Sequence, residues 1–315
     1  MTDKSNKTLL QWHEEFCSMQ QHVRGLRPAT IDSFRNTFRV FSKLTSEDLM
    51  PGMLTNALII QFFTKLNTRE RKVGVTVKSG IKTSTTSTYY SKLKPFFDYL
   101  VRQKIIEISP FDGIDKPKVS YEDVKYLKKE QVEKILTAIA LNVDWKNDFI
   151  KSRNLAMIHI LLFTGIRKGE LLNLKVTDFD FNTGLVKVNG QTSKSKIDRE
   201  VPINTRIIKI IKSYLADRKA SNCPFFFVGE RGERFTESGL KHLIEKIKDA
   251  SNIRFHIHQF RHTFAMNMVN KGCDIARLQC LMGHKDIRQT SVYLRKMPSV
   301  IVRNTIELLD IDTLV

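Results

Sequence analysis

The sequence predicts a mostly α-helical protein of two domains, with a small antiparallel β-sheet in the second domain. Three observations support this fold class. Apolar residues recur at helical spacing through the first third of the chain, an extended proline-containing segment follows at 108–127, and two short strand-like runs appear only beyond it. The length of 315 residues is sufficient for two domains that each bury a core.

The first helix that the pattern predicts covers residues 26–44. Pro28 stands near its start, where the missing backbone N–H of proline costs nothing. Apolar side chains then recur at helical spacing and define one apolar face: Ile31, Phe34, Phe38 and Phe41.

Two more helices are predicted before the linker. One covers residues 54–66, and the other follows the hydroxyl-rich stretch 80–88 and runs through 89–104, where Pro95 should kink the helix or mark its early turn. The segment 108–127 contains two prolines, one glycine and little periodicity, which is typical of a linker. Such a basic, extended segment either tethers two domains or crosses a DNA backbone, and the sequence favours neither.

The remainder of the chain mixes helices and strands. Residues 128–140 and 152–163 show helical patterns, and the second of these is apolar enough to be a buried core helix. Two short strands are predicted at 185–190 and 199–203, joined in a hairpin by the polar, basic residues 191–198.

Helices are expected again from about Thr205, with a turn rich in glycine and arginine at 229–234. The tail 300–315 is apolar with acidic residues, so we expect it to pack on the body of the protein or on a neighbouring protomer.

Composition narrows the function. The net charge of +19 and the pI of about 9.8 favour a polyanionic partner, and nucleic acid is the common one, although charge does not separate DNA from RNA. The four cysteines form no CxxC pair and suit a reduced cytosol. Because the start of the chain has no signal-peptide pattern and no apolar run reaches membrane-spanning length, we expect a cytoplasmic protein with no membrane partner.

Arg167 is the first candidate for chemistry. It follows Gly165, a break after the predicted buried helix, and precedes 168–174, which begins another. A guanidinium at a helix N-terminus suits a phosphate, because the helix dipole and the planar fork of donors both favour an anion. A salt bridge to Glu170 explains Arg167 equally well, and Glu170 could also orient it.

Three residues of the stretch 256–268 are further candidates. His258 and Arg261 are three residues apart, so on a helix they share a face and could bind two oxygens of one phosphate. We expect His262 to point elsewhere and to pack or cap. The spacing of His258 and His262 occurs in zinc helices, but Gln259 stands where that motif needs a glutamate, so we expect no metal.

The last candidates for catalytic residues indicate a chemistry only when they are considered together. Lys194 at the predicted hairpin tip could donate a proton, with Lys196 as a nearby competitor. His284 after a glycine is by itself better explained as a core histidine, and Tyr293 as a packing aromatic. A phenol can nevertheless attack phosphorus and conserve the bond energy in an ester, if cations stabilise the phosphate in the transition state.

In this order the residues resemble the catalytic set of the tyrosine recombinases, the phage integrase family. The stretches TGIRKGELLNL, TSKSKIDREVPI, HQFRHTFA and LMGHKDIRQTSVYL resemble four motifs of that family, in order, between about residues 125 and 300. The chain departs at Phe260, where leucine is usual, and at Ser193 and Ser195, where glycines are common. It is most similar to the simpler members, of the Xer type or the minimal integrases of mobile elements.

The resemblance implies a role for each residue. Tyr293 would be the nucleophile, Arg167, His258 and Arg261 would bind the scissile phosphate, Lys194 would protonate the leaving oxygen, His284 would assist by hydrogen bonding, and Glu170 would orient Arg167. No cofactor and no metal would be needed. A further set is expected to contact DNA: Thr85, Thr86, Ser87, Lys92, Lys94 and Lys196.

The resemblance also implies an architecture. Residues 1–113 would be a helical, SAM-like core-binding domain, 114–125 a linker, 126–300 the catalytic domain, and 301–315 a tail docked on the next protomer. The two domains would form a C-shaped clamp on double-stranded DNA, with four protomers exchanging strands through a Holliday junction. The rivals are a type IB topoisomerase that relaxes DNA and a non-catalytic DNA-binding protein of the same fold. The sequence does not distinguish dimer resolution, integration and excision, or inversion.

Overall fold

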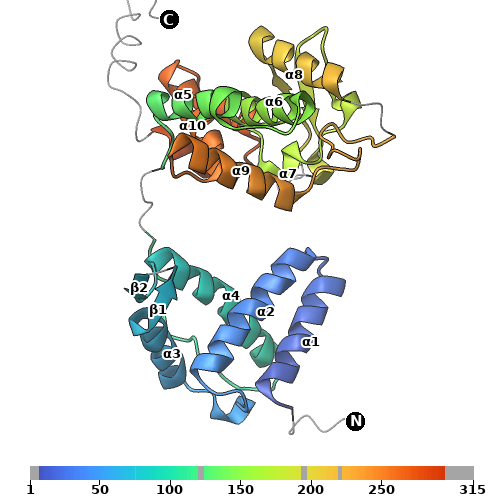
Figure 1. Cartoon of the computed structure of the whole chain (residues 1–315). Coiled ribbons are helices and arrows are strands. Elements are labelled where there is room, and N and C mark those ends of the chain that lie inside the picture. Colours follow the sequence, from blue (N-terminus) through green and yellow to red (C-terminus); the bar gives the residue numbers. More distant parts are fainter. Residues whose placement is uncertain (1–6, 75, 120–123, 193–196, 219–221, 295–315) are drawn as a thin grey trace, which may run out of the picture. The chain divides into compact units, whose positions relative to one another are not determined.

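The computed structural model describes residues 7–74, 76–119, 124–192, 197–218 and 222–294. The chain divides into two compact units, with the boundary between Tyr121 and Glu122 (Figure 1). Both units are mainly helical and contain short antiparallel strands, which confirms the predicted fold class. The C-shaped arrangement stays a prediction. Within the described residues, no helix is long and apolar enough to cross a membrane.

The described residues of the first unit form four α-helices around an aromatic core. Phe38 and Phe96 illustrate the packing, with ring centroids 5.4 Å apart at 81°, the edge-to-face geometry that aromatic rings prefer. The elements are α1 (Leu9–His22), α2 (Pro28–Leu44), a short 3₁₀ turn (Pro51–Met53), α3 (Asn56–Thr68), β1 (Glu70–Val73), β2 (Thr76–Ser79) and α4 (Thr83–Arg102).

Predictions for this unit had mixed outcomes. The helix predicted at 26–44 is confirmed as α2, which begins at Pro28 and buries the predicted apolar face. The helix predicted through 89–104 is present as α4, but its start was misplaced, because α4 begins at Thr83, inside the hydroxyl-rich stretch. Thr86 is buried and its hydroxyl donates to the Asn67 side chain, so tertiary packing outweighs the weak helix propensity of serine and threonine. The helix α1 and the β1–β2 hairpin were not predicted.

The second unit combines helices with a three-stranded antiparallel sheet of order β3-β4-β5, in which Val186 pairs with Val201. The predicted hairpin strands are confirmed as β4 and β5, and β3 was not predicted. The helices are α5 (Lys129–Thr137), α6 (Asp148–Thr164), α7 (Lys168–Leu171), α8 (Thr205–Asp217), α9 (Glu237–Ser251), α10 (Ile257–Asn270), α11 (Ile275–Met282) and α12 (Arg288–Ser291), and the strands are β3 (Phe179–Asp180), β4 (Leu185–Val188) and β5 (Arg199–Pro202).

The helix α6 is the structural centre of the second unit. It packs against α8 and α10 and has buried residues around its circumference, as the sequence predicted. It ends at Gly165, whose φ of 64° is left-handed. A side chain at Gly165 would clash with the ring of Phe264 on α10, so glycine permits both the turn and the close approach. This turn leads directly into the candidate site.

Candidate active site

Arg167 stands at the N-terminus of α7, immediately after the Gly165 turn. Its guanidinium donates to Glu170 Oε1 at 2.9 Å and to the carbonyl oxygen of Gly283 at 3.2 Å. The predicted pair of Arg167 and Glu170 is therefore present. The helix that follows has only four residues, Lys168–Leu171, and is shorter than the 168–174 that the sequence predicted.

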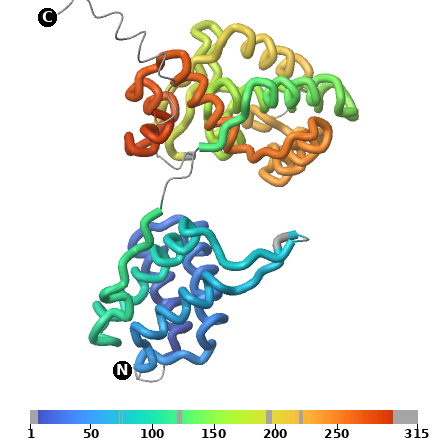
Figure 2. The backbone as a smooth tube through the Cα atoms, turned by 90° about the vertical axis from the view of Figure 1, so that its left-hand side faces the viewer, coloured from blue at the N-terminus to red at the C-terminus, as the bar shows by residue number. Residues whose placement is uncertain are grey.

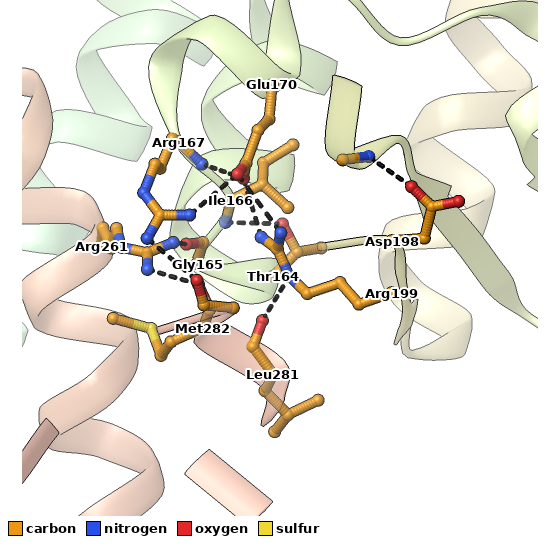
Figure 3. A network of polar contacts seen from close by, with 12 residues as sticks. Thr164, Gly165, Ile166, Arg167, Glu170, Asp198, Arg199, Arg261, Leu281 and Met282 are labelled. Atoms are coloured by element: carbon orange, nitrogen blue, oxygen red, sulfur yellow. Dashed lines mark hydrogen bonds and ion pairs between the residues drawn. The ribbon is translucent and has the colours of Figure 1, made fainter. Parts of the chain in front are cut away.

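Glu170 is the hub of a buried charge network (Figure 3). It accepts hydrogen bonds from the backbone N–H and the guanidinium of Arg167, and its second guanidinium partner is Arg199 of β5, at 2.7 and 3.2 Å. Burial alone would raise the pKa of the Glu170 carboxyl, but the bonds and charges of Arg199 and Arg167 lower it to about 2. The carboxylate is therefore ionised at all physiological pH values.

Arg261 of α10 lies beside Arg167 (Figure 3). Its guanidinium donates to the carbonyl oxygens of Gly165 and Met282, both at 2.5 Å. Burial, and then the charge of Arg167, lowers the pKa of Arg261, yet an arginine keeps its charge at neutral pH. Each of these two bonds uses one of five N–H groups, so the guanidinium has capacity for an additional anion.

The turn at the end of α11 collects the three arginines. Arg199 donates to the Leu281 carbonyl at 2.8 Å, Arg261 to that of Met282 and Arg167 to that of Gly283. These are carbonyls that a helix end leaves without intrahelical partners. Three guanidinium groups and one carboxylate leave an excess of positive charge, which is suited to a phosphate.

His284 follows this turn directly. Its Nδ1 lies 2.8 Å from the hydroxyl of the buried Thr290, and burial together with the charges of Arg261 and Arg167 lowers the pKa of the imidazole to about 3. The ring is therefore neutral at pH 7. If Thr290 donates to Nδ1, the ring hydrogen sits on Nε2, where His284 can donate it to an anion.

Tyr293 has a partner that the sequence reasoning misassigned. Its side chain is 2% exposed, and its hydroxyl lies 2.8 Å from Nδ1 of His262 on α10. The expectation that His262 points elsewhere was wrong: the ring lies at the nucleophile candidate. Burial raises the pKa of the Tyr293 phenol, while Arg261 and Arg167 oppose that rise, so both guanidinium groups act electrostatically on the phenol.

His258 lies one helical turn before Arg261 on α10, as predicted, with an exposed side chain. The pKa of His258 is lowered by partial burial and by the positive charges of Lys168, Arg261 and Arg167. His258 therefore lies in the same positive electrostatic field as the other site residues. Lys194 and Lys196 lie outside the described residues. The described residues contain no cluster of three or more side chains that could hold a metal ion.

The residues of the first unit that were expected to contact DNA differ in their solvent exposure and in their side-chain partners. Thr85 is exposed, but Thr86 and Ser87 are buried, at 6% and 7% exposure, so they belong to the packing of α4 rather than to a phosphate-facing surface. Lys94 pairs with Asp98 at 2.8 Å, and the ammonium group of Lys92 lies 4.4 Å from the centroid of the Phe34 ring.

The geometry thus defines an anion-binding site of arginines and neutral histidines with a hydrogen-bonded phenol in its field. The model of the phage integrase family matches residues 125–299. The chain is 30% identical to tyrosine recombinase XerC of Staphylococcus aureus (strain USA300) over 277 residues, covering 83% of this chain and 90% of that protein. It is 27% identical to XerC of Oceanobacillus iheyensis over 291 residues, covering 89% and 90%.

Two solved structures share the fold. The integrase of transposon Tn1549 in complex with transposon right end DNA has a TM-score of 0.75 at 19% identity, over 96% of this chain and 99% of that one. The recombinase XerH, bound to its difH substrate after cleavage, has a TM-score of 0.71 at 20% identity, over 95% and 84%. The chain belongs to the phage integrase family. It is a tyrosine recombinase, an enzyme of site-specific DNA recombination, as the sequence predicted.

Proposed function

We propose that this recombinase cuts and rejoins double-stranded DNA through a covalent 3′-phosphotyrosine at Tyr293. The phenol oxygen attacks the scissile phosphorus, and the bond from phosphorus to the 5′-oxygen breaks. The departing oxygen takes up a proton and leaves as a 5′-hydroxyl. Attack of a 5′-hydroxyl from the partner duplex on the phosphotyrosine ester reverses the step and exchanges the strands.

The observation that carries this proposal is the convergence of Arg167, Arg261 and His284 around the turn that ends α11, with the Tyr293 hydroxyl in their field. In the proposal, the two guanidinium groups and His258 bind the nonbridging oxygens of the phosphate, and His284 donates from Nε2. Fixed cations that are already paired with carbonyls reorganise little as charge develops on the phosphate.

Two protons must move in this reaction. The pKa of His262 is lowered by burial, His258 and Arg261, and in the tautomer with hydrogen on Nε2 its neutral Nδ1 can accept the hydrogen of the phenol. We propose that His262 takes this proton as the phosphorus–oxygen bond forms. Lys194 supplies the proton of the 5′-hydroxyl in this scheme.

The assembly is also part of the proposal. Four protomers hold two duplexes in a ring, the tail 301–315 docks on the next protomer, and successive exchanges form and resolve a Holliday junction. The core-binding domain, residues 1–113, and the catalytic domain, residues 126–300, clamp the DNA as a C with 114–125 as the linker, and the enzyme acts in the cytoplasm. Thr85, Lys92, Lys94 and Lys196 remain proposed DNA contacts.

A nicked suicide substrate tests the chemistry. The short fragment beyond the scissile phosphate diffuses away after cleavage, so the covalent adduct accumulates and can be separated by denaturing electrophoresis. We expect the wild-type chain to form the adduct, with or without a chelator, and Tyr293→Phe to form none while still binding DNA. An adduct in Tyr293→Phe would refute the assignment, and relaxation of one plasmid without transfer between duplexes would favour the topoisomerase.

A further inference from the structure

The β1–β2 hairpin projects from the helical body of the first unit as an arm (Figure 2). We define the arm as residues 69–74 and 76–82, between α3 and α4. The described side chains of β2 are all exposed, and Val77 keeps 58% of its surface in solvent. A lone two-stranded hairpin is marginally stable in water. The arm therefore contributes little to the hydrophobic core, so stabilisation of the first unit does not explain its presence.

The charges of the arm are strongly one-sided. It carries five cationic residues and one acidic residue, Glu70; the cations are Arg69, Arg71, Lys72, Lys78 and Lys82. In the register of the hairpin, Arg71 stands directly opposite Lys78. Like charges at directly opposed positions destabilise a hairpin. An anionic partner along the ribbon would relieve this repulsion.

The base of the arm is held firmly, unlike a loose loop. Arg71 donates from Nε to the Gly80 carbonyl at 2.9 Å, and Ser79 donates from its hydroxyl to the Thr68 carbonyl at 3.2 Å. Gly80 is buried with a φ of 67°, and any side chain there would clash with the Asn67 carbonyl oxygen. The fixed base sets the direction of the ribbon before any partner binds, which lowers the entropy cost of binding.

We propose that this arm enters a major groove of the DNA. The inference rests on the proposed function only in that the substrate is duplex DNA. A strand of four residues is about 13 Å long, and the major groove is about 12 Å wide and 8.5 Å deep, wide enough for a two-stranded ribbon. Lys72 and Lys78 meet the phosphates, and Thr76 and Val77 near the tip reach the base edges.

An arm with two fewer positive charges tests this inference. In the full-length chain with Tyr293→Phe, which separates binding from cleavage, Lys72→Gln and Lys78→Gln together remove two cations. Arg71 is kept, because its side chain holds the base. The matched control is Arg102→Gln with Lys104→Gln, which removes two exposed cations at the other end of α4, about 30 Å from its start.

The first measurement is the salt dependence of DNA binding. Each phosphate contact contributes about 0.9 to the slope of log K against log salt, so the arm variant should lower the slope by about 1.8 and weaken binding about tenfold near physiological salt. The control should match the parent. An arm variant with the slope of the parent, or a control with the same loss as the arm variant, overturns the proposal.

The second measurement identifies the groove. Dimethyl sulfate methylates guanine N7 in the major groove and adenine N3 in the minor groove. We expect the parent to protect a patch of guanine N7 that the arm variant exposes. Loss of adenine N3 protection instead, or an unchanged pattern, overturns the assignment to the major groove. Adduct formation by the chain with Tyr293 intact is scored separately, so failure of the chemistry is distinguishable from failure of the arm.

Discussion

Replacing Glu170 by glutamine should destabilise the second unit at neutral pH by about 3 kcal/mol. Glutamine keeps the shape of the side chain and removes its charge, which leaves Arg199, whose side chain is 6% exposed, without its carboxylate. The pKa of Glu170 falls from 4.5 to about 2 in the folded chain. Each pKa unit corresponds to about 1.4 kcal/mol, and breaking a buried ion pair costs about 3–5 kcal/mol, so the two routes to the magnitude agree.

The sign of the pH dependence follows from the direction of the shift. The folded-state pKa of Glu170 lies below its unfolded value, so its contribution to stability is complete above pH 4.5 and is lost as pH falls toward 2. Below that range the wild-type carboxyl is protonated and is almost isosteric with glutamine. The free energies of unfolding of wild type and Glu170→Gln should therefore converge as the pH is lowered.

The two tryptophans provide the assay, because Trp12 lies in the first unit and Trp145 in the second. In a Trp12→Phe background, urea unfolding followed by fluorescence reports on the second unit through Trp145, whose indole N–H donates to the Ile139 carbonyl. The control Glu230→Gln removes an exposed carboxylate of the same unit and should change little. A difference between Glu170→Gln and wild type that persists from pH 7 to pH 2, or no difference at pH 7, would refute the electrostatic account.

Three more predictions address the site. Thr290→Val should slow adduct formation about tenfold at unchanged DNA affinity, because His284 loses the hydroxyl that fixes its tautomer; an equal loss of affinity would contradict this role. His262→Phe should lower the rate of single-turnover cleavage at least 100-fold, with partial recovery in His262→Asn. Wild-type cleavage should decline only below pH 6.5, where the lowered pKa of His262 allows the imidazole to be protonated. Equal cleavage rates in wild type and His262→Phe would exclude His262 as the base. Gly165→Ala should destabilise the second unit more than Gly272→Ala, which costs about 1–3 kcal/mol, because both have positive φ but only Gly165 would also clash with a neighbour; urea unfolding that ranks them equally would contradict this.

Periodicity and residue propensity predicted those helices and strands whose formation depends mainly on nearby residues in the sequence. The apolar face of α2, the buried helix α6 and the strands β4 and β5 follow from periodicity and propensity. The start of α4 was misplaced, because the burial of Thr86 against Asn67 depends on tertiary packing. The β1–β2 arm escaped prediction because its strands bury too little for an alternating pattern to appear.

The site could be predicted only as far as sequence neighbours make contact. Arg167 and Glu170 are three residues apart on one helical face, so their pair followed from spacing. Arg199 meets Glu170 across 29 residues, and His262 meets Tyr293 across 31, distances that periodicity does not address. The one available clue that His262 belongs to the site was its spacing four residues after His258, because residues at that spacing share a helix face.

The buried network explains why the site draws on segments so distant in the sequence. An arginine that binds phosphate must be fixed yet keep donors to spare, and a carbonyl partner satisfies both needs without cancelling the charge. The end of α11 supplies carbonyls to Arg167 and Arg261. The single carboxylate of Glu170 neutralises about one positive charge, and Arg167 shares it with Arg199. A second carboxylate would have held the arginines as firmly, but it would have removed the positive field that lowers the pKa of His284 and opposes the rise in the pKa of the Tyr293 phenol. The ratio of guanidinium groups to carboxylates therefore sets the positive field of the site, and Arg199 and Arg167 share the single carboxylate of Glu170.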